Sequence, residues 1–419
     1  MSEAATLEPR VASAPGAPSP VREWVMTGAV VLTPLLAYLV SLWFAGLVAL
    51  GGLIAVPLLF RDRRPILGLA FLVALALWAT ASMAWSLFHL PPEPVSIENL
   101  TAVKMLLEVG LYGAFVSAAL GMSKAGARRA TLVLTVALPL LAAFFLVEAI
   151  NGARLYFWIR DAYGQPSDDL SFAVRDVSRV AFPLVLLFWP VAVGLAERKL
   201  WPAAAALAVA IVVGSVLLGA DAPAAALAAS AAVFFLVRWK GRPALWTCMA
   251  LVAFYFIAAP ILAHLVPGSH VMASPALASW AERLDIWRFT ADRIMERPFF
   301  GWGLDASRMF PPHIQLHPHN GALQLWLELG AVGAGLAALF WAWLFGRIDR
   351  VEAADRPMAA ACAATATVYL AIGALSFGVW QDWWIALGAL AAAACATGLT
   401  ARRAGPAPEE AAADPASAV

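Results

Sequence analysis

The feature that most constrains this chain is a series of twelve apolar runs, each about long enough for one helix to cross a membrane. Only α-helices and closed β-barrels satisfy their backbone hydrogen bonds inside a bilayer. The runs are continuous rather than alternating with a period of two, so they indicate helices. We therefore predict an all-α polytopic membrane helix bundle of about 12 transmembrane helices. The runs lie at about 24–43, 44–60, 66–89, 105–122, 131–150, 180–196, 202–219, 221–237, 244–263, 320–346, 358–378 and 381–400.

The composition agrees with a membrane protein. Of the 419 residues, 62% are hydrophobic and only 13% are charged, which is more apolar surface than one soluble core could hide. The formal net charge of +1 argues against a nucleic-acid or other polyanionic partner for the whole chain. Cys248, Cys362 and Cys395 each fall inside an apolar run, so we interpret them as small core residues rather than a disulfide framework or metal site.

The distribution of basic residues predicts the orientation. With the N-terminus inside, 18 of the 28 Lys and Arg residues fall on the cytoplasmic side, and the opposite topology would reverse this bias. Both termini are therefore predicted to be cytoplasmic, and two long connections, 151–179 and 264–318, are predicted to be periplasmic.

These assignments divide the chain into five parts. The first and last parts, rich in Ala and Pro, are predicted to be disordered. The first apolar run is too long for a signal-peptide core, so we interpret it as a membrane span. The parts are the cytoplasmic N-terminus 1–20, transmembrane helices 1–9 at 21–263 with the loop 151–179, the periplasmic loop 264–318 with an interfacial helix, transmembrane helices 10–12 at 319–403, and the cytoplasmic tail 404–419.

Nine arginines and no lysine occupy the two long periplasmic loops. Arginine suits bidentate capture of phosphate or carboxylate. The alternative is that most of them pair with acidic residues of the same loops, as exposed charges commonly do. The nine are Arg154, Arg160, Arg175, Arg179, Arg283, Arg288, Arg293, Arg297 and Arg308.

A histidine and an asparagine end the second loop. Asn320 is well placed to cap the tenth span, which leaves His319 just before a helix N-terminus at the membrane surface. A helix N-terminus attracts anions, and a neutral histidine there could act as a general base on a hydroxyl. The alternative is that His319 only neighbours the cap. His313 and His317 make a zinc site conceivable, but nearby prolines and the lack of a cysteine argue against it, so we assign no metal.

A helix lying in the membrane interface is predicted upstream, from an N-cap and first-turn pair at Ser274-Pro275 to Pro298. Arg283 and Trp287 lie one turn apart on it, so the Trp287 ring could support the guanidinium. The alternative is that Trp287 anchors in the headgroup layer.

The histidine motif resembles the signature of a known family. His319-Asn320 is followed after nine residues by Gly330 and after two more by Gly333. This pattern is similar to that of the O-antigen ligase family, membrane glycosyltransferases that move glycans from a polyprenyl-diphosphate carrier to lipid A-core.

A second motif carries the same resemblance. The pair Arg283 and Trp287, followed by Pro298 with Gly301 and Gly303, looks like that family's Arg-x-x-x-Trp helix and its Pro-x-x-Gly-x-Gly turn. We therefore assign the tryptophan and the glycines, with Asn320, a structural role.

The resemblance implies a reaction and a location. The chain would transfer glycan from undecaprenyl diphosphate to lipid A-core at the periplasmic face of the bacterial inner membrane, by a metal-independent inverting transfer without a cofactor. Its partners would be the undecaprenyl-diphosphate-linked donor, the lipid A-core acceptor and membrane lipids. Catalysis is assigned to His319 as base and Arg283 on the diphosphate, and diphosphate binding to Arg175 or Arg179 and to Arg288.

Two alternatives stay open. An O-antigen or exopolysaccharide polymerase would use the same chemistry with a carrier-linked acceptor. A polysaccharide or lipid transporter would be a different class, but transporters often contain internal repeats, and the sequence has no convincing one.

Overall fold

The computed structural model describes residues 19–62, 67–88, 100–163, 169–265 and 278–402, and over these ranges the regular structure is helical, with no strand. The fold class is therefore as predicted. The N-terminal segment before residue 19, the tail from residue 403 and the proposed cap at Ser274-Pro275 lie outside the described residues.

Each of the twelve apolar runs coincides with a helix. These are α1 (Pro20–Leu39), α2 (Phe44–Asp62), α3 (Leu67–Ser82), α4 (Thr101–Leu120), α5 (Lys124–Ile150), α8 (Ala181–Glu197), α9 (Trp201–Leu217), α10 (Asp221–Lys240), α11 (Arg242–Leu265), α13 (Gly321–Glu352), α14 (Arg356–Leu375) and α15 (Asp382–Arg402). Ten helical stretches of the described chain are long and apolar enough to cross a membrane. The spans assigned to α1 and to the 17-residue α9 stay predictions.

The first helix begins earlier than the apolar pattern indicates. Pro20 occupies its first turn, where a proline needs no hydrogen-bond partner for its nitrogen. The helix ends at Leu39, and a 3₁₀ turn at Ser41–Trp43 leads directly into α2. The predicted run 24–43 therefore covers α1 except for its first four residues, and also this turn.

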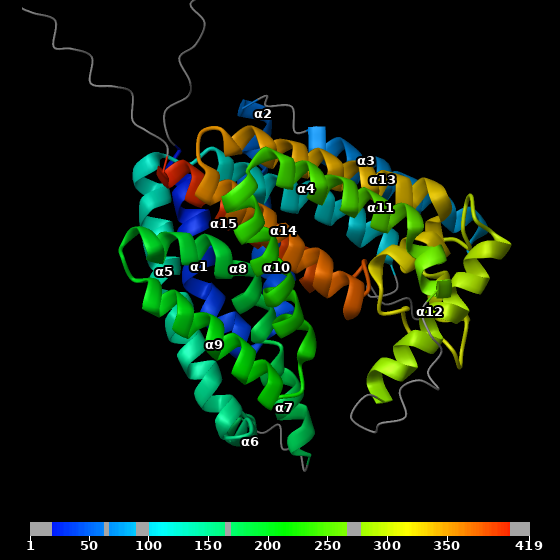
Figure 1. Ribbon diagram of the computed structural model, residues 1–419, viewed down its shortest axis with the longest axis horizontal. Coiled ribbons are helices and arrows are strands. Elements are labelled where there is room, and N and C mark those ends of the chain that lie inside the picture. Colours follow the sequence, from blue (N-terminus) through cyan, green and yellow to red (C-terminus); the bar gives the residue numbers. More distant parts are fainter. Residues whose placement is uncertain (1–18, 63–66, 89–99, 164–168, 266–277, 403–419) are drawn as a thin grey trace, which may run out of the picture.

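Three further helices lie at one end of the bundle. They are α6 (Arg154–Ala162), α7 (Leu170–Ser178) and α12 (Ala278–Glu296), and α12 ends just before Pro298, as expected. Figure 1 shows them opposite the end at which α1 begins (blue) and α15 finishes (red). We call the end that carries α6, α7 and α12 the distal end.

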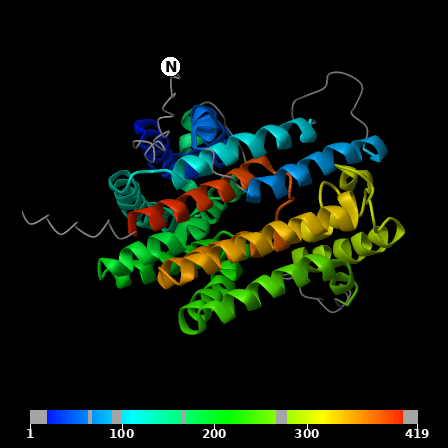
Figure 2. The same ribbon diagram turned by 90° about the horizontal axis from the view of Figure 1, so that it is seen from above.

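Two large hydrophobic cores hold most of the described helices together, and a small third cluster joins α2 to α4. The larger joins α1, α5, α8, α10, α14 and α15, with α8 almost entirely buried at its centre. The smaller joins α3, α11, α12 and α13 with the segment after α12. Figure 2 shows α11 and α13 running side by side, and they share one of the most extensive contacts in the chain. The three cysteines are free and buried, as predicted.

Candidate active site

The predicted cap of α13 is present. Asn320 has extended backbone angles, and its side-chain oxygen accepts the backbone N–H of Leu323 at 3.1 Å. The same oxygen accepts the hydroxyl of Tyr255 on α11 at 2.9 Å. Asn320 therefore satisfies a free N–H of the first helical turn and also fixes the start of α13 against α11.

His319 is held in one orientation by the chain between α14 and α15. Its Nδ1 lies 2.9 Å from the carbonyl oxygen of Ser376. A carbonyl can only accept, so Nδ1 carries the hydrogen, and in a neutral ring the lone pair is on Nε2. The side chain is partly exposed. His319 can therefore present an unprotonated nitrogen to a hydroxyl group.

His317 lies behind His319 and is buried. Its Nδ1 accepts the backbone N–H of His319 at 3.2 Å, and the two rings meet edge to face with their centroids 4.5 Å apart. Burial lowers the pKa of His317 to about 3, with smaller electrostatic contributions from His319, Arg308 and Arg283. His317 is therefore neutral at physiological pH. In the sequence, His317 stood out only as part of a conceivable zinc site.

The chain between α14 and α15 is part of the site, although no motif marked it. The backbone N–H of Val379 donates to the side-chain oxygen of Gln324 at 2.9 Å. The Gln381 amide lies 3.3 Å from Nε2 of His317, and a Cβ on Gly378 would touch both Gln324 and the His317 ring at 3.0 Å. This loop therefore packs against the histidine motif along much of its length.

Glu328 connects the same loop to the turn after α12. It is fully buried, and Oε1 accepts the side-chain amide of Gln324 at 3.0 Å. Its Oε2 accepts the indole N–H of Trp380 at 2.6 Å and the backbone N–H of Asp305 at 3.1 Å. With three donors directed at it, Glu328 is a structural anchor for the site.

The helix α13 is broken at Gly330, whose φ is 65° and ψ −162°. The break releases carbonyls before it, and the Pro-x-x-Gly-x-Gly turn satisfies them. The N–H of Trp302 donates to Leu327 and that of Gly303 to Glu328, both at 2.8 Å. The two glycine motifs therefore form one unit, in which the turn completes the hydrogen bonds of the broken helix.

Close packing explains the glycines of this unit. Gly301 also has positive φ, at 69°, and a Cβ there would lie 2.5 Å from the Glu328 carbonyl. A Cβ on Gly330 would overlap the carbonyl of Phe299. Gly303 and Gly333 are equally close to Ser86 and Leu329 respectively. For Gly301 and Gly330 the constraint comes from the contact between turn and helix, and both have positive φ.

The arginine predicted to be catalytic, Arg283, is partly buried on α12. Its guanidinium lies over the ring of Trp280 at 5.1 Å and not over Trp287, so the predicted stacking partner is wrong. Within the described residues it has no carboxylate at ion-pair distance. Burial lowers the pKa of Arg283, while nearby Asp221 and Glu282 oppose that shift. This leaves a guanidinium free to bind an anion.

The indole of Trp287 instead fixes the histidine motif. Its N–H donates to the carbonyl oxygen of Pro318 at 2.9 Å, directly before His319. In a helix, residues one turn before and one turn after Arg283 are both placed to stack on its guanidinium. The spacing alone therefore could not distinguish Trp280 from Trp287.

The first-loop arginines differ in their partners. Arg179 and Arg160 share the carboxylate of Asp176, at 2.6 and 3.1 Å. Arg175 is exposed, lies 4.7 Å over the ring of Phe172, and makes no ion pair within the described chain. The helix α7, which carries Arg175 and ends directly before Arg179, packs on α5 and α6.

The second-loop arginines are also divided. Arg293 pairs with Glu296 at 2.7 Å, and Arg308 lies 3.4 Å from Asp305. Arg288 is exposed and has no ion-pair partner in the part of the chain that the structure describes. The alternative that these arginines only pair with acidic neighbours therefore holds for some and not for Arg283, Arg288 or Arg175.

An apolar cleft opens beside the histidine motif. Its volume is about 230 Å³, and α11, α12, α13 and α14 form its walls. Two motif residues, Asn320 and Trp287, line it together with Tyr255, Ala259, Leu262, Ala263, Leu323, Ala374 and Leu375. An apolar chain could therefore lie next to the polar groups of the site.

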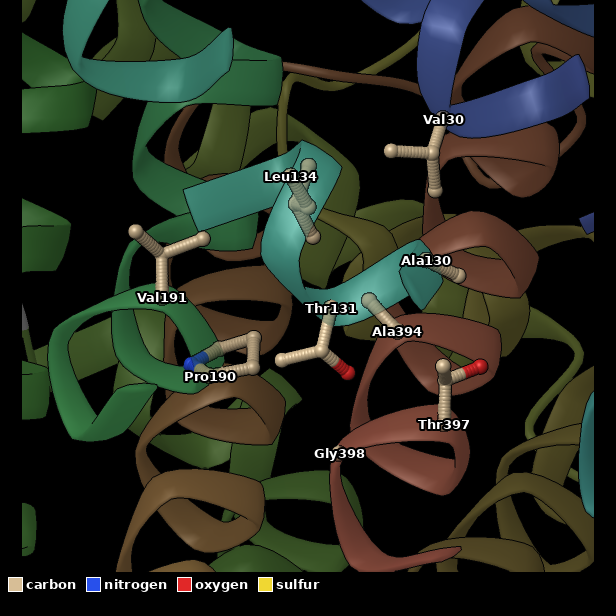
Figure 3. A pocket seen from close by; sticks show the side chains of 9 residues that line it. All are labelled: Val30, Ala130, Thr131, Leu134, Pro190, Val191, Ala394, Thr397 and Gly398. Carbon is tan, nitrogen blue, oxygen red and sulfur yellow. The ribbon is translucent and has the colours of Figure 1, made fainter. Parts of the chain in front are cut away.

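A second cavity is unrelated to these residues. It has about 10 Å³ and lies where α1, α5, α8 and α15 meet, between Val30, Thr131, Pro190 and Thr397 (Figure 3). No motif residue lines it.

The three histidines of the second loop do not gather around one point. His313 stacks on Phe289 with centroids 4.3 Å apart, whereas His317 and His319 face each other. In the described ranges, no group of three His, Cys, Asp or Glu side chains could hold a metal ion.

The fold and site define a class: an all-α polytopic membrane protein with a histidine at a capped helix end, an unpaired arginine nearby and an apolar cleft beside them. Residues 205–338 match the family model described as O-antigen ligase. This confirms the resemblance to the O-antigen ligase family, and the matched segment contains the second loop, the histidine motif and the break in α13.

Curated relatives match this chain over segments of comparable length. A Rickettsia conorii protein named "putative polysaccharide ligase" is 34% identical over 124 residues, or 26% of this chain and 30% of the relative. A protein of the same description from Rickettsia typhi is 31% identical over 149 residues, or 32% and 36%. The matches thus span about a third of these relatives' length.

Proposed function

We propose that this chain is a membrane glycosyltransferase that transfers a glycan from undecaprenyl diphosphate to lipid A-core at the periplasmic face of the inner membrane. The family match and the names of the relatives support glycan transfer. The observation that carries the proposal is the geometry of His319, whose Nδ1 donates to Ser376 and whose Nε2 is left to accept a proton.

The proposed reaction is a single displacement. The acceptor hydroxyl gives its proton to Nε2 of His319 as its oxygen bonds to the anomeric carbon of the glycan. The bond from that carbon to the diphosphate oxygen breaks, and the diphosphate leaves on its lipid. Attack opposite the leaving group inverts the configuration of the anomeric carbon.

Arginines stabilise the leaving group in this scheme. Charge develops on the diphosphate oxygens as the bond breaks, and a fixed guanidinium at that position lowers the barrier. Arg283 is suited to this task because it is partly buried and makes no ion pair within the described chain. Arg288 on the same helix and Arg175 of the first loop are proposed to assist in binding the diphosphate.

The apolar cleft supports a lipid-linked donor. A polyprenyl diphosphate joins a long apolar chain to a charged head, so its site requires an apolar wall beside cationic groups. The cleft provides the wall, and Trp287 and Asn320 form part of it next to His319. A nucleotide-sugar donor would have no use for such an arrangement.

Two alternatives are weaker. A polymerase would keep the same donor chemistry, but the matched relatives are named ligases. Broken membrane helices are also common at transporter binding sites. Here, however, N–H groups of the turn after α12 donate to the carbonyls of Leu327 and Glu328 before the break at Gly330. These two carbonyls are therefore already hydrogen-bonded and are not available to an ion.

The test uses a bacterial strain that lacks its own ligase. Wild type, His319→Ala and the matched control His313→Ala are expressed at equal membrane levels, and lipopolysaccharide is separated on a gel. We expect glycan ladders on lipid A-core with wild type and the control but not with His319→Ala. Transfer only to a second carrier-linked glycan would instead indicate the polymerase.

A further inference from the structure

The backbone of His319 adopts an unusual conformation. Its φ is 53°, in the left-handed region that few residues other than glycine adopt without support. This conformation turns the His319 ring back toward α14, where Nδ1 meets the Ser376 carbonyl. Some other group must therefore hold the backbone at this point.

His317 is the group that contacts this backbone. Its Nδ1 accepts the N–H of His319 at 3.2 Å and closes a short ring over two residues. Acceptance requires an unprotonated Nδ1, and burial holds the pKa of His317 at about 3, so the acceptor persists at physiological pH. His319, Arg308 and Arg283 make smaller electrostatic contributions in the same direction.

The second ring nitrogen of His317, Nε2, lies beside Gln381 of the α14–α15 loop. A neutral ring that accepts at Nδ1 carries its hydrogen on Nε2. Nε2 lies 3.3 Å from the amide of Gln381, whose Oε1 is buried without a hydrogen-bond partner in the described chain. A half-turn of that amide places Oε1 against the ring and satisfies both groups.

We propose that His317 is a positioning residue for the transfer reaction: Gln381 orients it, and its Nδ1 fixes the His319 backbone so that Nε2 of His319 faces the substrate. The inference rests on the proposed function. It assigns a role to the α14–α15 loop, which lies beyond the matched segment 205–338 and supplies both Gln381 and the Ser376 carbonyl.

Two conservative substitutions separate positioning from simple packing. The side-chain oxygen of asparagine can occupy the position of Nδ1, and that of glutamine the position of Nε2. His317→Asn should therefore keep the bond to the His319 backbone, whereas His317→Gln and His317→Leu should lose it. Misplacing the base should lower kcat by ~100-fold and leave KM for both substrates nearly unchanged.

The experiment uses the full chain in lipid nanodiscs with undecaprenyl-diphosphate-linked glycan and lipid A-core. Transfer kinetics and melting temperature are measured for wild type and the three His317 variants. In parallel, ¹⁵N-histidine NMR reports which ring nitrogen of His319 carries hydrogen, with the signal assigned by its absence in His319→Ala.

We expect wild type and His317→Asn to show hydrogen on Nδ1 of His319 and near wild-type kcat, and the other two variants to lose both. Equal kinetics for the Asn and Gln variants at equal melting temperature, or an unchanged tautomer in His317→Leu, would overturn the proposal. Because the NMR result does not depend on transfer, it still decides the positioning role if His319→Ala retains activity and the proposed function fails.

Discussion

The indole N–H of Trp287 donates to the carbonyl oxygen of Pro318 at 2.9 Å and so connects α12, which carries Arg283, to the backbone directly before His319. The two side chains assigned to the reaction are therefore coupled through Trp287. A change at this bond should alter the distance between the base and the guanidinium.

Trp287→Phe is expected to lower transfer by about fivefold, because it removes one hydrogen bond of about 1 kcal/mol while keeping an aromatic ring in the core. Purified protein would be assayed for kcat and melting temperature. The control is Trp239→Phe, at an exposed residue of α10 whose indole makes no hydrogen bond within the described chain. Equal activity of the two variants would contradict a linking role for Trp287.

Two glycines of α13 make a matched pair for stability. An alanine at Gly330 would have positive φ and overlap the Phe299 carbonyl, whereas a Cβ on Gly335 would meet nothing within 4 Å. We expect Gly330→Ala to destabilise the fold by at least about 1–3 kcal/mol, and Gly335→Ala to leave it unchanged or slightly stabilised. Thermal unfolding in detergent compares them. A similar melting temperature for both would mean that the turn after α12 does not need the break.

Local patterns in the sequence predicted the local features of this chain. Each apolar run coincides with a helix, Asn320 caps α13, and α12 ends before Pro298. The break at Gly330 was missed because a single glycine inside an apolar run is also compatible with a continuous helix.

Contacts between distant segments could not be predicted in this way. The Ser376 carbonyl that orients His319 and the Gln381 amide beside His317 belong to a loop more than fifty positions away. Neither has a local signature, since a backbone carbonyl is present in every residue and a single glutamine has no pattern. The assignment of His317 therefore depends on the three-dimensional structure.

The buried His317 predicts a pH dependence of stability. Its pKa of about 3 in the folded protein lies below the ordinary value of 6.5, so the unfolded chain binds a proton that the folded chain does not. The free energy of unfolding is therefore not reduced by His317 above pH 6.5, and it decreases as the pH falls toward 3. Between pH 6.5 and 5 the loss is expected to reach ~2 kcal/mol.

The check is the melting temperature of wild type and His317→Asn across this pH range. Other titrating groups contribute equally to both proteins, so the difference isolates His317. Wild type should lose more stability than the variant on acidification. Parallel curves would mean that His317 is not buried as a neutral ring.

Arg283 should be the arginine most sensitive to substitution. Arg283→Ala is expected to lower kcat by about 10²–10³, the usual effect of removing one donor to developing negative charge. Arg283→Lys should retain only part of the wild-type kcat, because an ammonium group cannot bind two oxygens in the planar manner of a guanidinium. Arg297→Ala serves as control, since Arg297 is exposed and lies over Trp302. Full activity of Arg283→Ala at normal membrane levels would exclude a role for Arg283 in stabilising the departing diphosphate.

The first-loop arginines should differ because only one has a carboxylate partner. Arg179 shares Asp176 with Arg160, so Arg179→Ala should cost at most about 1 kcal/mol of stability and change transfer little. Arg175 is exposed without such a partner in the described chain, so Arg175→Ala should keep the melting temperature and raise KM for the lipid-linked donor. Donor titrations with both variants at constant acceptor concentration would compare them. A larger rise in KM for Arg179→Ala would mean that the ion pair with Asp176 opens on binding and that Arg179 holds the diphosphate instead.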